Sequence, residues 1–159
     1  METDVVRYIA CLLIVTLGAA FVAETAGAEQ SRPNILWITC EDISPNLGCY
    51  GDEFAITPHL DRLAEQGRTF TVAPSASAVC TPSFYALLTG EYPVRKNLYP
   101  PVFLKTGLLI DTKQQTIATV MQDAGYATAC IGKWHLGFGE QRPDWNGDLK
   151  PGPLELGFD

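Results

Sequence analysis

The segment NILWITC, residues 34–40, is almost entirely apolar and leads directly into two acidic residues, Glu41 and Asp42. A short continuous apolar run of this kind is typical of a strand that is buried on both faces. In open sheets built from such strands, ligands bind at the loops that follow the carboxyl ends. We therefore predict a strand over residues 34–40, with the acidic pair at a binding edge of the sheet.

Two helices are predicted downstream from their start and stop signals. Thr57 stands as an N-cap before a proline, and an apolar stripe follows as far as Gly67, which we expect to be left-handed. Thr116 precedes a second segment, in which apolar residues recur at i, i+3, i+4 and i+7 until Gly125. These patterns predict helices over residues 58–66 and 117–124.

Short strands are predicted between and after these helices. Residues 69–72 and 127–131 are interpreted as strands, whereas residues 90–113 and 138–153 are interpreted as long surface connections. Strands that alternate with helices predict an α/β fold with a largely parallel sheet sandwiched by helices. Because residues 154–159 contain no closing strand or helix, we expect this sequence to be the N-terminal part of a larger catalytic domain, incomplete at its C-terminus.

The first 28 residues have the organisation of a secretory signal peptide. A charged start ending at Arg7 precedes an apolar run over residues 8–23, and AGA at residues 26–28 offers a cleavage site. The alternative is an N-terminal membrane anchor, although the run is short for a span. We predict an exported protein, periplasmic or secreted, with a mature chain over residues 29–159 and no stable membrane span after cleavage.

The charge and the cysteines exclude some functions. Removing residues 1–28 takes away three acidic residues and one basic residue, which changes the net charge from -7 to -5. We expect no nucleic-acid partner, because phosphate contacts need clustered Lys and Arg. The cysteines of the mature chain show no Cys-x-x-Cys metal pattern, and we predict no disulfide framework among them. They are Cys40, Cys49, Cys80 and Cys130.

Cys80 is the candidate nucleophile. It precedes Thr81 and Pro82, and a proline in the first turn indicates that a helix begins here. A thiol at a helix N-terminus lies near the positive end of the helix dipole, which favours its reactive anionic form. A free cysteine is also commonly a small buried hydrophobe, so the pattern alone leaves both interpretations open.

Two further groups with useful chemistry follow predicted strands. Lys133 and His135 flank Trp134, and an extended backbone places the first two on one face and Trp134 on the other. Such a lysine can neutralise a bound anion, and a neutral histidine can exchange protons. Glu41 and Asp42 offer oxygen donors that Ca²⁺ or Mg²⁺ prefers, although calcium usually takes about six to eight oxygens. Taken singly, each group also has an ordinary structural interpretation.

Five motifs in a fixed order favour the functional interpretation of these groups over the structural one. They are NIL at 34–36 with ED at 41–42, GCYG at 48–51, TPHLDRLA at 57–64, CTPS at 80–83 with LLTG at 87–90, and GKWHLG at 132–137. Together they closely resemble the N-terminal part of the formylglycine-dependent (type I) sulfatases, an arylsulfatase-like group in the alkaline-phosphatase-like superfamily. The resemblance covers residues 32–159.

The resemblance implies a role for each candidate residue. Cys80 matches the cysteine that a separate formylglycine-generating enzyme oxidises, and the hydrated formylglycine attacks the sulfur of a sulfate ester. Glu41 and Asp42 match the first ligands of a divalent cation, usually calcium, to which the modified Cys80 also belongs. Lys133 and His135 match residues that hold the formylglycine hydrate and the sulfate. The implied substrate is a sulfate-ester small molecule or a sulfated carbohydrate.

Phe84 departs from the family pattern, which has arginine at this position. On a helix, residue 84 lies one turn after Cys80 on the same face, where an arginine can reach back toward the nucleophile and its anions. Loss of a buried charge-assisted contact typically costs about 2–5 kcal/mol. We favour a sulfatase. The alternatives are a catalytically inactive or truncated homologue, and a phosphatase or phosphonate hydrolase of the same superfamily.

Overall fold

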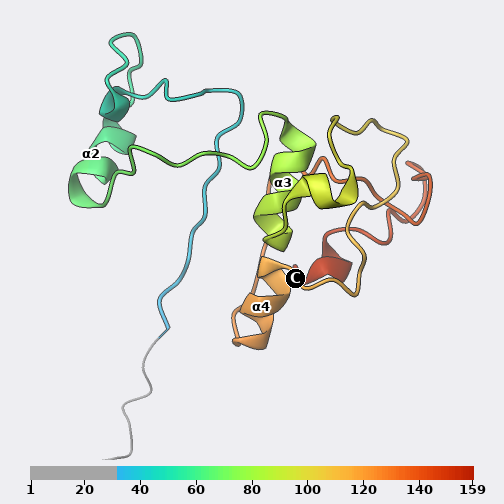
Figure 1. Cartoon of the computed structure of the whole chain (residues 1–159). Helices are drawn as coiled ribbons and strands as arrows, with labels where there is room; N and C mark the ends of the chain where they lie inside the picture. Colours follow the sequence, from blue (N-terminus) through green and yellow to red (C-terminus); the bar gives the residue numbers. More distant parts are fainter. Residues whose placement is uncertain (1–31) are drawn as a thin grey trace, which may run out of the picture. The chain divides into compact units, whose positions relative to one another are not determined.

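The computed structural model describes residues 32–159, and its helices are short (Figure 1). The chain divides into two units, residues 1–40 and residues 41–159, and the second unit contains every helix of the described part. In chain order these are η1 (Gly48–Tyr50), α2 (Pro58–Gln66), α3 (Cys80–Thr89), η2 (Pro93–Lys96), α4 (Ile117–Asp123) and η3 (Leu154–Leu156). The predicted signal peptide, residues 1–28, lies outside the described residues.

The predicted sheet is not confirmed, because residues 32–159 contain no strand. Residues 34–40, 69–72 and 127–131 run without regular secondary structure, and none of them forms a ladder of backbone hydrogen bonds; residues 127–131 have a single such bond, from the Asp159 amide to the Thr128 carbonyl oxygen at 3.0 Å. A strand exists only when another backbone accepts and donates its hydrogen bonds, and this condition is not met. Apolar side chains of these segments accordingly remain exposed, as at Leu36 (85%) and Ile131 (96%).

Helix α2 begins at Pro58 as predicted, but its ends differ from the expected cap geometry. The Thr57 hydroxyl does not cap the helix; it accepts from the Gly48 amide at 2.9 Å and donates to Asp61 at 3.0 Å. Asp61 also accepts from the Cys49 amide at 2.7 Å. Gly67 has φ -116° and not the predicted left-handed conformation. Thr57 and Asp61 therefore bind helix α2 to η1.

Helix α4 has the predicted start. The Thr116 hydroxyl accepts from the Thr119 amide at 3.2 Å, and the Thr119 hydroxyl accepts from the Thr116 amide at 2.9 Å, which completes a capping box. The buried Thr116 hydroxyl also donates to the Leu156 carbonyl oxygen at 2.7 Å. Gly125, just after the helix, has the expected positive φ of 83°. The start of helix α4 is thereby bonded to η3.

The hydrophobic core is small and lies around helix α3, which also contacts α4 and η2 (Figure 1). Its buried members come from segments far apart in the sequence: Tyr85, Ile110, Trp134, Leu136 and Leu156. Ile110 is 1% exposed, which corrects the prediction that residues 90–113 form a surface connection throughout. The core thus fixes the segment that contains Lys133 and His135 against helix α3.

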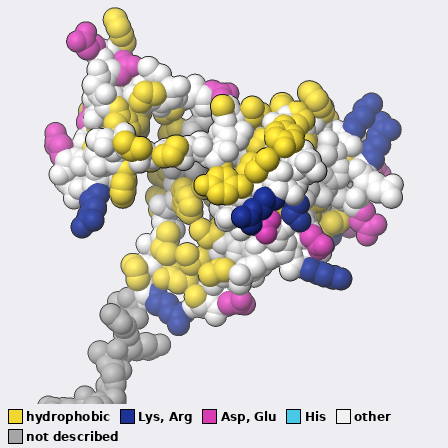
Figure 2. Space-filling view, viewed as in Figure 1, with side chains coloured by type: hydrophobic (Ala, Val, Ile, Leu, Met, Phe, Trp, Pro, Cys, Tyr) yellow, Lys and Arg dark blue, Asp and Glu magenta, His cyan; other side chains and the backbone are white. Residues whose placement is uncertain are grey.

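The surface carries many hydrophobic side chains (Figure 2). Large exposed examples include Phe54, Ile56, Phe70 and Val72. No helix within residues 32–159 is long and apolar enough to cross a membrane.

Candidate functional site

Cys80 is the first residue of helix α3, as the Cys-Thr-Pro sequence predicts. The preceding residue, Val79, has extended backbone dihedrals, and the helix runs from Cys80 to Thr89. Cys80 is half-buried, whereas the next two residues, Thr81 and Pro82, are buried. The thiol therefore lies at the accessible start of a helix whose first turn is fixed by burial.

Thr81 connects this first turn to two distant segments. Its hydroxyl donates to the His135 carbonyl oxygen at 2.9 Å and accepts from the Val102 amide at 3.1 Å. The Thr81 side chain is fully buried, at 0% exposure. A single hydroxyl thus holds the start of helix α3, the connection after η2 and the Lys133–His135 segment in one place.

Lys133 forms an ion pair with Glu41, 92 positions away in the sequence. This hydrogen bond is the main reason why the pKa of Lys133 is raised above 10.5, and desolvation opposes it. The negative charges of Glu41 and Asp42 raise the pKa of Lys133 further. The ion pair places the Lys133 ammonium group directly against the first residue of the acidic pair.

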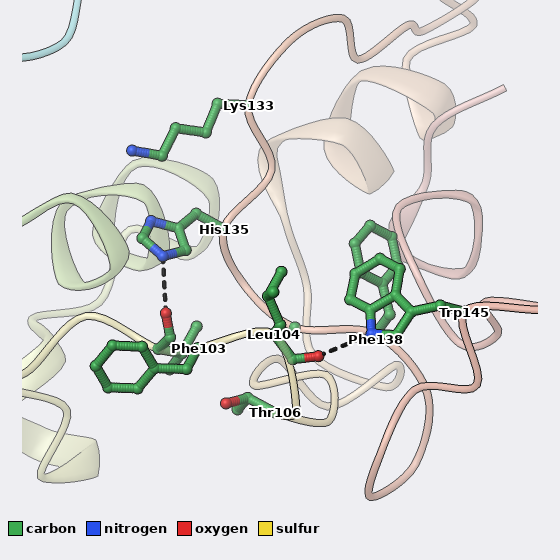
Figure 3. A pocket seen from close by; sticks show the side chains of 9 residues that line it. Phe103, Leu104, Thr106, Lys133, His135, Phe138 and Trp145 are labelled. Carbon is green, nitrogen blue, oxygen red and sulfur yellow. Dashed lines mark hydrogen bonds between the residues drawn. The ribbon is translucent and has the colours of Figure 1, made fainter.

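His135 is held in one orientation by its ring and by its backbone. Its Nε2 atom lies 2.8 Å from the Val102 carbonyl oxygen, and because a carbonyl only accepts, Nε2 carries the proton of this bond. The other ring nitrogen, Nδ1, is buried and has no hydrogen-bond partner among the described residues. Figure 3 shows Nδ1 on the side of the ring that faces Lys133. In the neutral ring, Nδ1 is therefore a free proton acceptor.

A cavity of about 350 Å³ opens beside Lys133 and His135 (Figure 3). Trp134, the residue between them, is 9% exposed and belongs to the core, whereas Lys133 and His135 line the cavity. The predicted extended backbone is wrong at His135, which has a left-handed φ of 53°. The cavity walls are mostly apolar. The full set of lining residues is Val102, Phe103, Leu104, Thr106, Lys133, His135, Gly137, Phe138 and Trp145.

Glu41 and Asp42, the predicted metal ligands, do not form a complete set of ligands by themselves. Within residues 32–159, no three His, Cys, Asp or Glu side chains are grouped as ligands of one ion. Glu41 and Asp42 have the oxygen donors that a hard cation prefers, but one Glu41 oxygen is already bound by the Lys133 ammonium group. The donor chemistry therefore fits calcium, whereas the number of donors does not complete its coordination.

The contacts of Phe84 and Tyr85 are structural. Phe84 is half-buried and packs against the core. The Tyr85 hydroxyl donates to Glu91 at 3.0 Å and accepts from the Gln114 amide at 3.2 Å, so it is fully engaged by these partners. Neither side chain provides the cation that the family pattern has at position 84.

Thr81, Val102 and Trp145 belong to this site but were not predicted from the sequence. Thr81 stands next to Cys80, but a threonine at a helix start has many ordinary explanations. Val102 and Trp145 lie within segments without a periodic pattern, which gives no local signal of their position. Only the folded chain brings them to Lys133 and His135.

Comparison with known proteins identifies the family to which this chain belongs. A family model described as Sulfatase matches residues 33–159, which is most of the chain. The chain belongs to the sulfatase family, whose solved members have the alkaline-phosphatase-like fold.

Individual relatives support this assignment. The chain is 43% identical to an N-acetylgalactosamine-6-O-sulfatase of Bacteroides thetaiotaomicron over 140 residues, covering 87% of this chain and 27% of the relative. It is 42% identical to human arylsulfatase A over 125 residues, covering 76% of this chain and 24% of the relative. The chain thus spans about a quarter of the length of these relatives.

A solved structure agrees with the sequence comparisons. This structure is described in connection with the metabolism of multiple glycosaminoglycans by Bacteroides thetaiotaomicron. It superposes with a TM-score of 0.69 at 46% identity and covers 72% of this chain and 24% of its own.

Proposed function

We propose that residues 29–159 are the N-terminal part of the catalytic domain of an exported sulfatase, a hydrolase of sulfate esters. The observation that carries this proposal is the ion pair between Lys133 and Glu41, beside the cavity that Lys133 and His135 line. Thr81, the residue after Cys80, donates to the His135 carbonyl oxygen at 2.9 Å and so holds the start of helix α3 next to them. Three segments far apart in the chain thus contribute to one polar centre beside a cavity.

In this proposal Lys133 and His135 bind the sulfate group. The Lys133 ammonium group attracts the anionic ester and stabilises negative charge that develops during its transfer. The Nδ1 atom of His135 is free to accept a proton, since Nε2 is committed to the Val102 carbonyl oxygen. Through its bond to the His135 carbonyl oxygen, Thr81 keeps this segment beside the start of helix α3.

Two groups that this chain does not itself supply complete the proposal. Cys80 would be converted to formylglycine by a formylglycine-generating enzyme, and that group would supply the nucleophile. Glu41 and Asp42 would hold a calcium ion, which supplies Lewis-acid polarisation of the sulfate oxygens. Lys133 is paired with Glu41 in this structure. The Glu41 carboxylate, which would bind calcium, therefore already has a positively charged partner within the chain.

The relatives suggest which esters to test. Of the two relatives described above, one is named as an N-acetylgalactosamine-6-O-sulfatase and the other as an arylsulfatase. We include both a sulfate-ester small molecule and a sulfated carbohydrate as substrates in the proposal.

A second candidate function is that of a catalytically inactive homologue that binds sulfated ligands. Phe84 favours it, because an apolar side chain packed against the core replaces the arginine of the family pattern. A phosphatase or phosphonate hydrolase is disfavoured, because the Cys80-x-Pro-Ser sequence is the sulfatase pattern.

Mass spectrometry of the peptide that contains Cys80 separates the two candidates. The full chain is co-expressed with a formylglycine-generating enzyme, and Phe84→Arg and Phe84→Leu are prepared in parallel. An aldehyde at Cys80 in the unmodified sequence supports the sulfatase. A thiol there, with an aldehyde in Phe84→Arg and none in Phe84→Leu, supports the inactive homologue. A thiol in all three proteins rejects the formylglycine chemistry.

A further inference from the structure

We propose that the ion pair between Lys133 and Glu41 is a closed state of this site, which opens when Glu41 binds a divalent cation or Lys133 binds an anion. In the closed state the Lys133 ammonium group takes the place of the cation, and the Glu41 carboxylate takes the place of the anion. The inference rests on the proposed function and adds regulation to it, because each ligand binds more tightly once the other has opened the pair.

Both partners of the ion pair are accessible from solvent. The side chain of Lys133 is 44% exposed, and that of Glu41 is 30% exposed. Water and salt weaken an ion pair with this much exposure, so a dissolved ion can compete with either partner. A buried pair, in contrast, leaves an uncompensated charge when it is opened. The exposure therefore suits a contact that opens and closes.

The Lys133 ammonium group can move without a change in the backbone beneath it. The residues after Lys133 are fixed, since Trp134 is 9% exposed and donates its indole N–H to the Gly137 carbonyl oxygen at 2.8 Å. Leu136 is fully buried. Lysine carries its charge on a flexible four-carbon stem, and Figure 3 shows this stem extended from the backbone. Opening the pair thus needs rotations within one side chain only.

Cation and anion binding are coupled because both break the same contact. A cation at Glu41 needs the carboxylate oxygen that Lys133 holds, and an anion at Lys133 needs the ammonium group that Glu41 holds. The ligand that binds first opens the pair, and the second ligand finds its partner already free. By thermodynamic linkage, each ligand then raises the affinity of the other by the same factor. An exposed ion pair allows a factor of about two to five.

Simple charge repulsion is the alternative explanation, because any carboxylate near Lys133 weakens anion binding. Asp42 provides a control for this effect within the chain. Asp42 acts on Lys133 through its charge alone, whereas Glu41 acts through its charge and a hydrogen bond. Asp42→Asn therefore removes a neighbouring negative charge and keeps the ion pair. Glu41→Gln removes both the charge and the ion pair.

Titration of the full chain with methanesulfonate, followed by NMR of the backbone amides at constant ionic strength, tests the inference. This probe carries the single charge of a sulfate ester, is not hydrolysed and stays soluble with calcium. Without divalent cations, we expect Glu41→Gln to bind methanesulfonate about two- to fivefold more tightly than the unmodified chain does, and more tightly than Asp42→Asn does. Calcium should raise the affinity of the unmodified chain and have little effect in Glu41→Gln.

A second measurement does not depend on the anion. Calcium should bind to Lys133→Met about two- to fivefold more tightly than to Lys113→Met. Lys113 is exposed and does not line the cavity, so its loss changes the net charge equally without opening the pair. Both partners of the ion pair are partly exposed, so all of these variants are expected to fold.

The inference is overturned if Glu41→Gln gains no more affinity for methanesulfonate than Asp42→Asn does, or if no variant binds methanesulfonate. Calcium binding that is no tighter in Lys133→Met than in Lys113→Met also overturns it. The proposed function is tested separately at Cys80. The expected gains together with an unmodified thiol reject the sulfatase and retain the closed state, whereas formylglycine without these gains rejects the closed state alone.

Discussion

Replacing Thr81 with valine tests whether one buried hydroxyl holds the site together. Valine has nearly the same shape as threonine, so the change removes the hydroxyl with little change in packing. Two bonds are lost, from the hydroxyl to the His135 carbonyl oxygen at 2.9 Å and from the Val102 amide to the hydroxyl at 3.1 Å. Thr81 is 0% exposed, so the change also removes the partner of two backbone groups.

The expected loss of stability follows from these two bonds. A buried donor or acceptor left without its partner costs roughly 1–3 kcal/mol. Both backbone groups lie in partly buried surroundings, where water can replace some of the loss, so we expect about 2–3 kcal/mol in total. With a urea dependence of roughly 1–3 kcal/mol per molar, the unfolding midpoint should fall by about 0.7–3 M.

Urea unfolding followed by circular dichroism measures this loss, and amide hydrogen exchange shows where it arises. Thr81→Ser is the matched control, because it keeps the hydroxyl and removes only a methyl group. We expect faster exchange of the Val102 amide in Thr81→Val and near-normal exchange in Thr81→Ser. The reasoning is refuted if Thr81→Val unfolds at the same urea concentration as the unmodified chain and its Val102 amide remains protected.

Three further predictions follow from the charges. The pKa of Asp52 is held below 3.8, chiefly by a hydrogen bond from the Asn46 amide. The contribution of the Asp52 carboxylate to stability should therefore be present above about pH 3.8 and be lost as pH falls through the lower folded pKa. Asn46→Ala should raise the pKa of Asp52 in an NMR titration. The pKa of Lys133 is raised above 10.5, so its stabilising effect should be present below that pH and be lost as pH rises through the higher folded value. Glu41→Gln should shift the Lys133 titration downward, and an unchanged titration would exclude the ion pair as its cause. Calorimetric titration with calcium should show millimolar or weaker binding, because Glu41 and Asp42 supply too few oxygens; micromolar binding that Asp42→Asn abolishes would contradict this.

Helix starts could be predicted because their causes are local. Pro58 and Thr116 determine the first turns of α2 and α4 through dihedral angles and hydrogen bonds within a few residues. The same local rules were wrong where a side chain had a better partner, since the Thr57 hydroxyl is bonded to η1 and Asp61. Local preference therefore predicts where a helix begins more securely than it predicts which bond a cap residue makes.

Whether the predicted strands pair into a sheet could not be determined from the apolar pattern. The run at residues 34–40 indicates a segment that is suited to burial on both faces, but pairing requires a second backbone in register. In the described part of the chain this partner is not provided, and Leu36 is exposed. Strand formation depends on contacts between distant segments, which no single segment encodes.

By itself, the sequence determined the family and the candidate chemistry, since the ordered motifs around Glu41, Cys80 and Lys133 are local signatures with distinct functional groups. The tertiary structure decided how those groups meet. In the folded chain Lys133 is paired with Glu41, and Phe84 packs against the core. Thr81 forms hydrogen bonds with the backbone of Val102 and His135 and keeps both beside helix α3. The physical reason is that charge effects and hydrogen bonds depend on distance in space, and residues 41, 81, 102 and 133 become neighbours only when the chain is folded.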